Sequence, residues 1–211
     1  MQKKQNGFLI VFEGIDGAGK STIARALYAH LQEKGLSVFL TREPGGSMVG
    51  AELRKIVQQQ VVPLDIKAEF LLFAADRAQH VADVIKPRLL NGELIISDRM
   101  YDSSYAYQGY GRGLDTHMIE QVNEWVMQGI KADLTIYINV SLDVSLQRIN
   151  ARGGLSSFEK RDFLARVKEG FESLYAKKRE GVCIINGDDS LEYVTKMVIK
   201  EVDAWIALQN L

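Results

Sequence analysis

Cysteine is almost absent from this sequence of 211 residues. Cys183 is the single cysteine, so no disulfide can form within the chain, and such usage is typical of the reducing cytoplasm. Cys183 lies in an apolar run, so we interpret it as a buried strand residue rather than a reactive thiol. We therefore expect a cytoplasmic protein.

An excess of charge of either sign and a long apolar run are also missing. The chain has 26 Lys and Arg against 27 Asp and Glu, which gives no support for a nucleic-acid-binding face or a polybasic membrane surface. No apolar run is long enough to span a membrane, and the polar stretch 1–6 is too short for a secretion signal. We find no internal repeat and no low-complexity linker. The length suits one α/β domain over residues 1–211. From the balanced charge and the short apolar runs, we expect neither nucleic acid nor a membrane as a partner.

A glycine-rich segment follows the apolar run Phe8–Phe12. It contains Gly-x-x-x-x-Gly-Lys-Ser, the pattern of a phosphate-binding loop, or P-loop. The glycines let backbone N–H groups approach a phosphate, Lys20 adds a positive charge, and Ser21 offers a hydroxyl to Mg²⁺. A helix from Ile23 to Leu31 would turn its N-terminus toward the phosphates. The alternative is a glycine-rich turn that joins a strand to a helix and binds nothing.

Strands alternate with helices along the rest of the chain. We expect further strands at 37–41, 94–97, 134–140 and 182–185. We expect helices at 50–59, 63–90, 115–128, 142–150, 158–179 and 190–208, with Pro87 disturbing the second and Trp125 on the apolar side of the third. This alternation predicts a parallel sheet with helices on both faces.

Several polar side chains follow the predicted strands, at the edge of a parallel sheet where ligands bind. Asp98 would lie near Mg²⁺, with a helix cap as the alternative, and Arg99 suits a phosphate. Phe73 and Arg77 are one helical turn apart and could hold a base by stacking and a hydrogen bond, with core packing of Phe73 as the alternative. The tyrosine-rich segment 101–113 is too polar for a core segment and is predicted to line a site.

A small kinase fits these features better than the other P-loop classes. A GTPase would carry Asn-Lys-x-Asp, which is absent, since Ile130 precedes Lys131-Ala132-Asp133. A motor ATPase would come with a larger chain. Phosphoryl transfer needs positive charge around the migrating group and a lid that excludes water. The arginines could supply the charge, and a glycine-rich break with Arg148 and Arg152 predicts a lid at about 148–158.

Five segments together resemble the bacterial thymidylate kinases. They are Phe12–Thr22, Thr41-Arg42-Glu43-Pro44-Gly45-Gly46, Leu72-Phe73-Ala74-Ala75-Asp76-Arg77, Asp98-Arg99 and Ser103–Gly113. The resemblance implies a three-layer P-loop NTPase fold with a five-stranded parallel sheet and a short lid. It also implies transfer of the γ-phosphoryl group of ATP to dTMP, giving dTDP and ADP, with Mg²⁺, in a homodimer.

The resemblance implies a role for each site residue. ATP would be bound by Gly14, Ile15, Asp16, Gly17, Ala18, Gly19, Lys20, Ser21 and Thr22. In the dTMP site, Phe73 would stack on thymine, Arg77 would bond its O4 edge, Ser104 and Gln108 would read its other polar edge, Tyr107 would crowd the 2′ position, and Arg54 and Arg99 would hold the phosphate. Asp16 and Glu43 would lie near the sugar, the acceptor phosphate or the metal. Asp98 would support Mg²⁺ through water, beside Ser21. Catalysis would fall to Lys20, Arg99, Asp16, Arg148 and Arg152.

The lid departs from the pattern of this family. Many bacterial relatives carry an Asp-Arg pair where this chain has Ser156-Ser157, and Gly17-Ala18 replaces the catalytic arginine of the eukaryotic P-loop. The charge over the migrating phosphoryl would therefore come from Arg148 or Arg152. Two rival functions stay open: a kinase of thymidine itself, disfavoured by the acceptor-side arginines, and an ATP-binding adaptor without turnover, favoured by the thin lid alone.

Overall fold

Five parallel strands form the centre of this computed structural model, which describes residues 7–59, 63–153, 158–176 and 180–209. The strand order is β2-β3-β1-β4-β5. The strands are β1 Phe8–Glu13, β2 Val38–Arg42, β3 Leu94–Asp98, β4 Leu134–Asn139 and β5 Val182–Asn186. The structure confirms the predicted parallel sheet, and each strand lies within about one residue of its predicted position.

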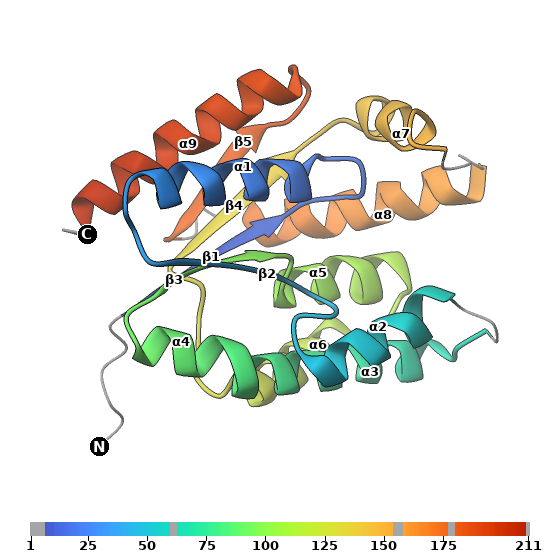
Figure 1. Cartoon of the computed structure of the whole chain (residues 1–211). Helices are drawn as coiled ribbons and strands as arrows, with labels where there is room; N and C mark the ends of the chain where they lie inside the picture. The colour runs from blue at the N-terminus through green and yellow to red at the C-terminus, as the bar shows by residue number, and fades with distance from the viewer. Residues whose placement is uncertain (1–6, 60–62, 154–157, 177–179, 210–211) are drawn as a thin grey trace.

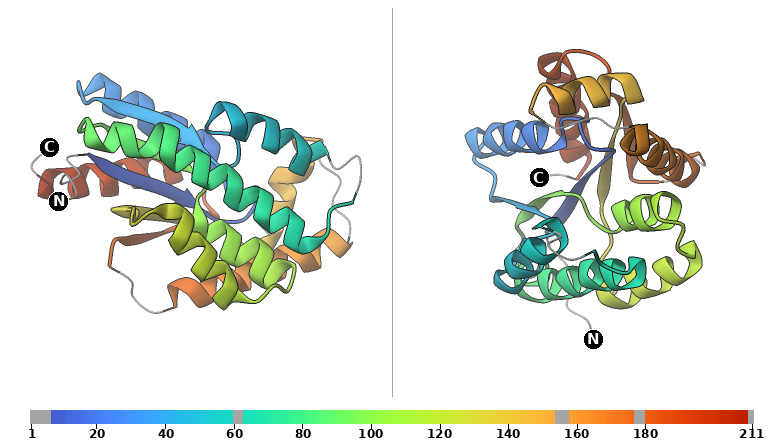
Figure 2. Two further views of the ribbon diagram at one scale, coloured as in Figure 1. Left: turned by 90° about the horizontal axis from the view of Figure 1, so that it is seen from below. Right: turned by 90° about the vertical axis from the view of Figure 1, so that its right-hand side faces the viewer.

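The helices cover both faces of this sheet (Figures 1 and 2). They are α1 Lys20–Glu33, α2 Met48–Gln59, α3 Ile66–His80, α4 Lys86–Leu90, α5 Tyr101–Ser104, α6 Thr116–Met127, α7 Leu142–Asn150, α8 Phe158–Tyr175 and α9 Leu191–Leu208. Asp65, Asp115, Ser141 and Ser190 cap four of them by accepting a hydrogen bond from a first-turn backbone N–H. These caps explain why the sequence located the helix starts well.

The central strand buries both of its faces because successive side chains point to opposite sides. Leu9 and Val11 join the cluster that includes Val81, Ile85 and Leu89. The alternate positions of β1 face the other cluster, which is built with α1, α8 and α9. Burying one large apolar side chain contributes about 1.5–3 kcal/mol, so burial on both faces holds β1 at the centre of the sheet. The buried strand thus fixes where the loop that follows it begins.

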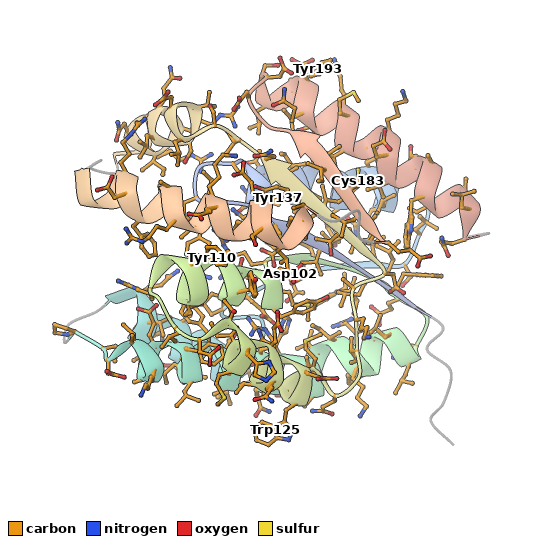
Figure 3. All side chains as sticks on the ribbon, turned by 180° about the vertical axis from the view of Figure 1, so that it is seen from behind. Asp102, Tyr110, Trp125, Tyr137, Cys183 and Tyr193 are labelled. Atoms are coloured by element: carbon orange, nitrogen blue, oxygen red, sulfur yellow. The ribbon has the colours of Figure 1, made fainter. Side chains whose placement is uncertain are left out.

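Two predictions about the helices need correction, and the segment 101–113, predicted only to line a site, is helical. The helix predicted over 63–90 is divided, because a π-helical segment, Val81–Ile85, separates α3 from α4. The tyrosine-rich segment also contains a π-helical stretch, Tyr105–Gly111, after the short α5. Trp125 does not lie on the apolar side of α6, since it is 80% exposed and points away from the protein in Figure 3. The buried side of α6 is formed by Ile119, Asn123 and Val126 instead.

Two other predictions meet the limits of the described residues. Within those residues, no helix combines the length and apolar character needed to cross a membrane. The predicted lid begins in α7 and ends at α8, and its residues 154–157 lie outside the described part of the chain.

Candidate active site

The P-loop joins β1 to α1, and its geometry requires glycine at Gly17 and Gly19, among other positions. Gly17 has a φ of +79°, and a Cβ there would lie 2.5 Å from the carbonyl oxygen of Ser145. Gly19, with a φ of +95°, immediately precedes α1. A side chain at either position would strain the backbone and displace the loop. The loop therefore keeps its N–H groups close to any anion at the start of α1.

Lys20 is buried beneath this loop. Its ammonium group donates hydrogen bonds to the carbonyl oxygens of Gly14 (2.9 Å) and Ile15 (2.8 Å). Burial, assisted by the charge of Arg99, lowers the pKa of Lys20 from 10.5 to about 8. A bound phosphate would favour the charged form. The two carbonyl groups therefore hold Lys20 in place, and a bound phosphate would raise its pKa.

The strand register brings three chain segments to the same edge of the sheet. Phe12 pairs with Asp98, and Asp98 pairs with Arg42, at the carboxyl ends of β1, β3 and β2. The Asp98 carboxylate accepts a hydrogen bond from the Ser21 hydroxyl. Ser21, Arg42 and Asp98 line a cavity of about 800 Å³, here called the larger cavity. Its lining also includes Asp16, Lys20, Thr22, Glu43, Arg54, Arg99, Arg152 and Lys160. Its volume suits a nucleotide.

The oxygen atoms of Ser21 and Asp98 fit a hard divalent cation such as Mg²⁺. No group of three or more His, Cys, Asp or Glu side chains that could enclose a metal is found among the described residues. Magnesium is commonly held by one or two protein oxygens, water and substrate phosphates, so the pair matches that mode better than a fully protein-bound metal.

Arg99 joins the loop after β3 to the P-loop. Its guanidinium donates to the carbonyl oxygen of Gly14 (3.0 Å), the hydroxyls of Ser103 (2.9 Å) and Tyr107 (2.9 Å), and the carboxylate of Asp16 (2.5 Å). Its backbone has a φ of +75°, which is rare for a residue other than glycine and is found at functional sites. Local desolvation raises the pKa of Asp16, but Arg99 and Lys20 outweigh it and hold that pKa below its ordinary value.

Glu13 supports this arrangement from inside the protein, where it is fully buried. Its carboxyl oxygens accept hydrogen bonds from the backbone N–H groups of Met100 (2.8 Å) and Ser103 (3.2 Å) and from the Ser103 hydroxyl (2.5 Å). Burial, reinforced by the negative charge of Asp102, raises the pKa of Glu13 to about 8. Glu13 therefore fixes the backbone that carries Arg99.

A smaller cavity of about 210 Å³ opens beside the larger one. Its lining includes six predicted substrate residues besides Arg99: Glu43, Phe73, Arg77, Ser104, Tyr107 and Gln108. Asp16, Glu43 and Arg99 line both cavities. The two cavities therefore meet at these three charged side chains.

Arg77 is fixed in the wall of the smaller cavity by four hydrogen bonds. Its Nε donates to Glu43 (2.8 Å), Nη1 to Asn123 (2.5 Å), and Nη2 to the carbonyl oxygen of Met100 (3.2 Å) and the hydroxyl of Ser104 (3.1 Å). The hydrogen bond from Nη1 to Asn123 uses one of its two N–H groups, and Arg77 also lines the smaller cavity.

Further side chains hold the ligand-facing residues in place. His80 is fully buried and its ring nitrogens face the hydroxyl of Thr41 (2.7 Å) and the second oxygen of Glu43 (3.0 Å). Gln108 donates to Glu69 (3.1 Å). His80 follows Arg77 by three residues on α3, so this spacing could have placed both side chains on one face of the helix. Glu69, the partner of Gln108, lies 39 residues away in the sequence, and no local pattern indicates this contact.

The structure separates the two predicted lid arginines. Arg152 lines the larger cavity. The described lining does not include Arg148, whose Nη2 donates to the carbonyl oxygen of Asp189 (2.7 Å) before α9. Arg54 lines the larger cavity and donates to the carbonyl oxygen of Pro44 (2.6 Å). Phe73 is partly buried in the smaller cavity rather than in the core clusters.

Comparison with known proteins shows the family of this chain. A family model described as thymidylate kinase matches residues 12–198. This chain belongs to the thymidylate kinase family. It is 40% identical over 201 residues to the thymidylate kinase of Halothermothrix orenii, covering 93% of this chain and 96% of the relative. It is 41% identical over 197 residues to that of Trichormus variabilis, covering 91% and 93%.

A solved structure supports the assignment of fold. The thymidylate kinase from Ehrlichia chaffeensis superposes with a TM-score of 0.78 at 32% identity, covering 93% of this chain and 98% of that one. The five-stranded sheet with its surrounding helices is therefore the P-loop NTPase fold of the thymidylate kinase family. A small kinase, predicted from the P-loop and the arginines, is the class to which the family belongs.

Proposed function

We propose that this protein transfers the γ-phosphoryl group of ATP to dTMP, giving dTDP and ADP. The observation that carries the proposal is the meeting of the two cavities at Asp16, Glu43 and Arg99. One cavity has the P-loop that a triphosphate requires, and the other has an aromatic side chain and fixed polar groups that suit a base. The transferred group would cross at the junction, where Arg99 supplies positive charge.

The donor would occupy the larger cavity. The backbone from Gly14 to Thr22 would surround its phosphates, and Lys20 would leave its carbonyl partners for the β- and γ-phosphates. Ser21 and Asp98 would hold Mg²⁺, Asp98 acting through water. Mg²⁺, when bound, neutralises part of the phosphate charge.

The acceptor would occupy the smaller cavity. Thymine would stack on Phe73 and accept a hydrogen bond at O4 from Arg77, while Ser104 and Gln108 would bond its remaining polar edge. Tyr107 lies between Arg99 and Asp16, where its ring would crowd a 2′-hydroxyl and favour deoxyribose. Arg99, which lines both cavities, and Arg54, which lines the larger one, would hold the acceptor phosphate where it extends into the larger cavity, with Glu43 next to the sugar.

The chemical step needs positioning and charge more than covalent work by the protein. An oxygen of the dTMP phosphate would attack the γ-phosphorus as the bond to the β-phosphate oxygen breaks, leaving ADP. Negative charge spreads over the transferred group during this step. Lys20, Arg99 and Arg152 would stabilise that charge, and Asp16 would orient Arg99 through the ion pair between them.

A coupled assay of ADP release tests the proposal. Wild-type protein would be incubated with ATP and Mg²⁺ and, in parallel, with dTMP, dUMP, thymidine, dGMP or UMP. We expect strong turnover with dTMP and little with thymidine, which has no phosphate for Arg54 and Arg99. Turnover with thymidine above that with dTMP would replace the proposal with nucleoside phosphorylation. No turnover with any acceptor, while ATP binds, would favour an adaptor.

We propose that the active form is a homodimer in the cytoplasm, where ATP is supplied. An exposed apolar surface on α2, α3 and α6 supports self-association: Met48, Ile56, Leu71, Met118 and Trp125 are 91, 50, 56, 54 and 80% exposed. The helix α3 packs against both α2 and α6, so the three helices that carry these side chains are neighbours. Exposed apolar area of this kind marks interaction surfaces.

Size-exclusion chromatography with light scattering tests the dimer. We expect the wild type to be a dimer and Trp125→Glu to be a monomer. Tyr193→Glu is the matched control, because Tyr193 is 52% exposed on α9 and lies on the opposite side of the molecule in Figure 3. A monomeric wild type, or a dimer unaffected by Trp125→Glu, would contradict this proposal.

A further inference from the structure

Lys160 approaches the larger cavity from α8, a part of the chain remote in sequence from the P-loop. It lies in the first turn of α8 and lines the cavity with Asp16, Lys20 and Arg152. The positive charge of Lys160 contributes to the lowered pKa of Asp16, after the larger effects of Arg99 and Lys20. The shared cavity lining is therefore the geometric observation, and the electrostatic effect on Asp16 agrees with it.

The lid side of the cavity otherwise has little positive charge in the described structure. Arg148 donates to the carbonyl oxygen of Asp189 and does not line the cavity. The sequence has Ser156-Ser157 where many bacterial relatives have an Asp-Arg pair. Among the described residues that line the cavity from 148 onward, Arg152 and Lys160 are the cations.

We propose that Lys160 contacts the γ-phosphoryl group of ATP and stabilises its transfer, in place of the absent lid arginine. The proposal rests on the proposed function. A lysine suits this place because its ammonium is a compact charge on a flexible four-carbon stem and binds phosphate as a point charge. No bond forms or breaks at Lys160. Its charge acts on the oxygens of the phosphoryl group as it leaves ADP for the acceptor.

The next residue in the helix provides a matched control. Arg161 also carries a positive charge in the first turn of α8, but it forms an ion pair with Asp143 (2.9 Å) and does not line the cavity. The side chains of Arg161 and Asp143 are 46% and 81% exposed, so removing this ion pair should have little effect on stability. Arg161→Gln therefore removes the same charge from the same turn without removing it from the cavity.

Steady-state kinetics with ATP and dTMP provide the first test. We expect Lys160→Gln to lower kcat about 100-fold while KM for dTMP changes less than about threefold, because the contact forms with the transferred group. We expect Lys160→Arg to recover at least a tenth of the wild-type kcat and Arg161→Gln to stay within about twofold of it. A Lys160→Gln kcat within about twofold of wild type, or an equal loss in Arg161→Gln, would overturn the proposal.

Nucleotide binding separates this proposal from the proposed function. Calorimetry without an acceptor measures the affinities of each protein for ATP and ADP with Mg²⁺. We expect Lys160→Gln to reduce the preference for ATP over ADP at least about threefold, and Arg161→Gln to leave it unchanged. An unchanged preference in Lys160→Gln would overturn the assignment even if dTMP is a substrate. A wild type that does not phosphorylate dTMP would overturn the proposed function, and this ratio would still decide the role of Lys160.

Discussion

Raising the pH from 7 to 9 should weaken ATP binding through Lys20. Lys20 is 5% exposed, and burial lowers the pKa of its ammonium group to about 8 in the nucleotide-free protein. About nine-tenths of the molecules then carry a charged Lys20 at pH 7 and about one-tenth at pH 9. The charged form is the one that pairs with phosphate, so the affinity should fall about tenfold. Binding above pH 8 should also take up a proton, because the phosphates favour the charged form.

Isothermal titration of ATP into the protein without an acceptor, at pH 7, 8 and 9, measures this effect. Repeating the titration in buffers of different ionisation enthalpy gives the number of protons taken up. Lys20→Arg should remove the dependence, because a guanidinium keeps its charge throughout this range.

Glu13 must be controlled for, since its pKa is also about 8. Glu13→Gln keeps an acceptor for the N–H groups of Met100 and Ser103 and cannot titrate. If Glu13→Gln retains the fall in affinity, the fall belongs to Lys20. A wild-type affinity that is constant from pH 7 to 9, without proton uptake, would refute the reasoning about Lys20.

Three further predictions test other parts of the site. Phe73→Ala should raise KM for dTMP roughly 5- to 150-fold, the equivalent of about 1–3 kcal/mol of stacking, and leave KM for ATP unchanged. An unchanged KM for dTMP would show that Phe73 packs within the protein and does not stack on the base. Arg152→Ala should lower kcat about 100-fold with a smaller effect on nucleotide binding, and Arg148→Ala should lower it less; an unchanged kcat in Arg152→Ala would exclude it from the chemical step. The pKa of Glu13 is raised in the folded protein, so the stability that its protonated form contributes should be lost as pH rises from 5 to 8. The melting temperature of the wild type should therefore fall over that range, and that of Glu13→Gln should fall less. Parallel curves for the two proteins would contradict a raised pKa of Glu13.

The parts of the fold that depend on local pattern were predictable from the sequence. The apolar runs bounded by glycine and charge gave the five strands, and side chains such as Asp65 and Ser190 marked where helices begin. The order of strands in the sheet was not predictable, because parallel pairing joins segments distant in the chain. The π-helical turn within the predicted 63–90 helix has no such local signal either.

Trp125 shows why residue type alone did not predict which side of α6 is buried. A large aromatic residue on an amphipathic helix is more often buried, yet Trp125 falls outside the stripe formed by Ile119, Asn123 and Val126. A polar residue, Asn123, takes a buried place because it accepts a hydrogen bond from Arg77. The buried side of α6 therefore includes a polar residue, which a search for apolar positions does not find.

The candidate site also has a part that the sequence predicted and a part that it did not. Among the residues of contiguous motifs, Asp16, Lys20 and Ser21 line the larger cavity and Phe73 and Arg77 line the smaller one, and their roles stay proposals. Supporting contacts were not predictable, because Asn123 reaches Arg77 and Glu69 reaches Gln108 from distant helices. The lid shows the limit most clearly. Charge alone could not distinguish Arg148, which contacts Asp189, from Lys160, which lines the cavity.

Following the γ-phosphoryl group itself tests the central claim most directly. ATP labelled in that group would be incubated with Mg²⁺, dTMP and the wild-type protein, and the nucleotides would then be separated. The two joined cavities predict that the label appears in dTDP, in an amount equal to the unlabelled ADP formed. Label found in inorganic phosphate with dTMP left unchanged would contradict the account, because the group would then have passed to water instead of crossing the junction at Asp16, Glu43 and Arg99.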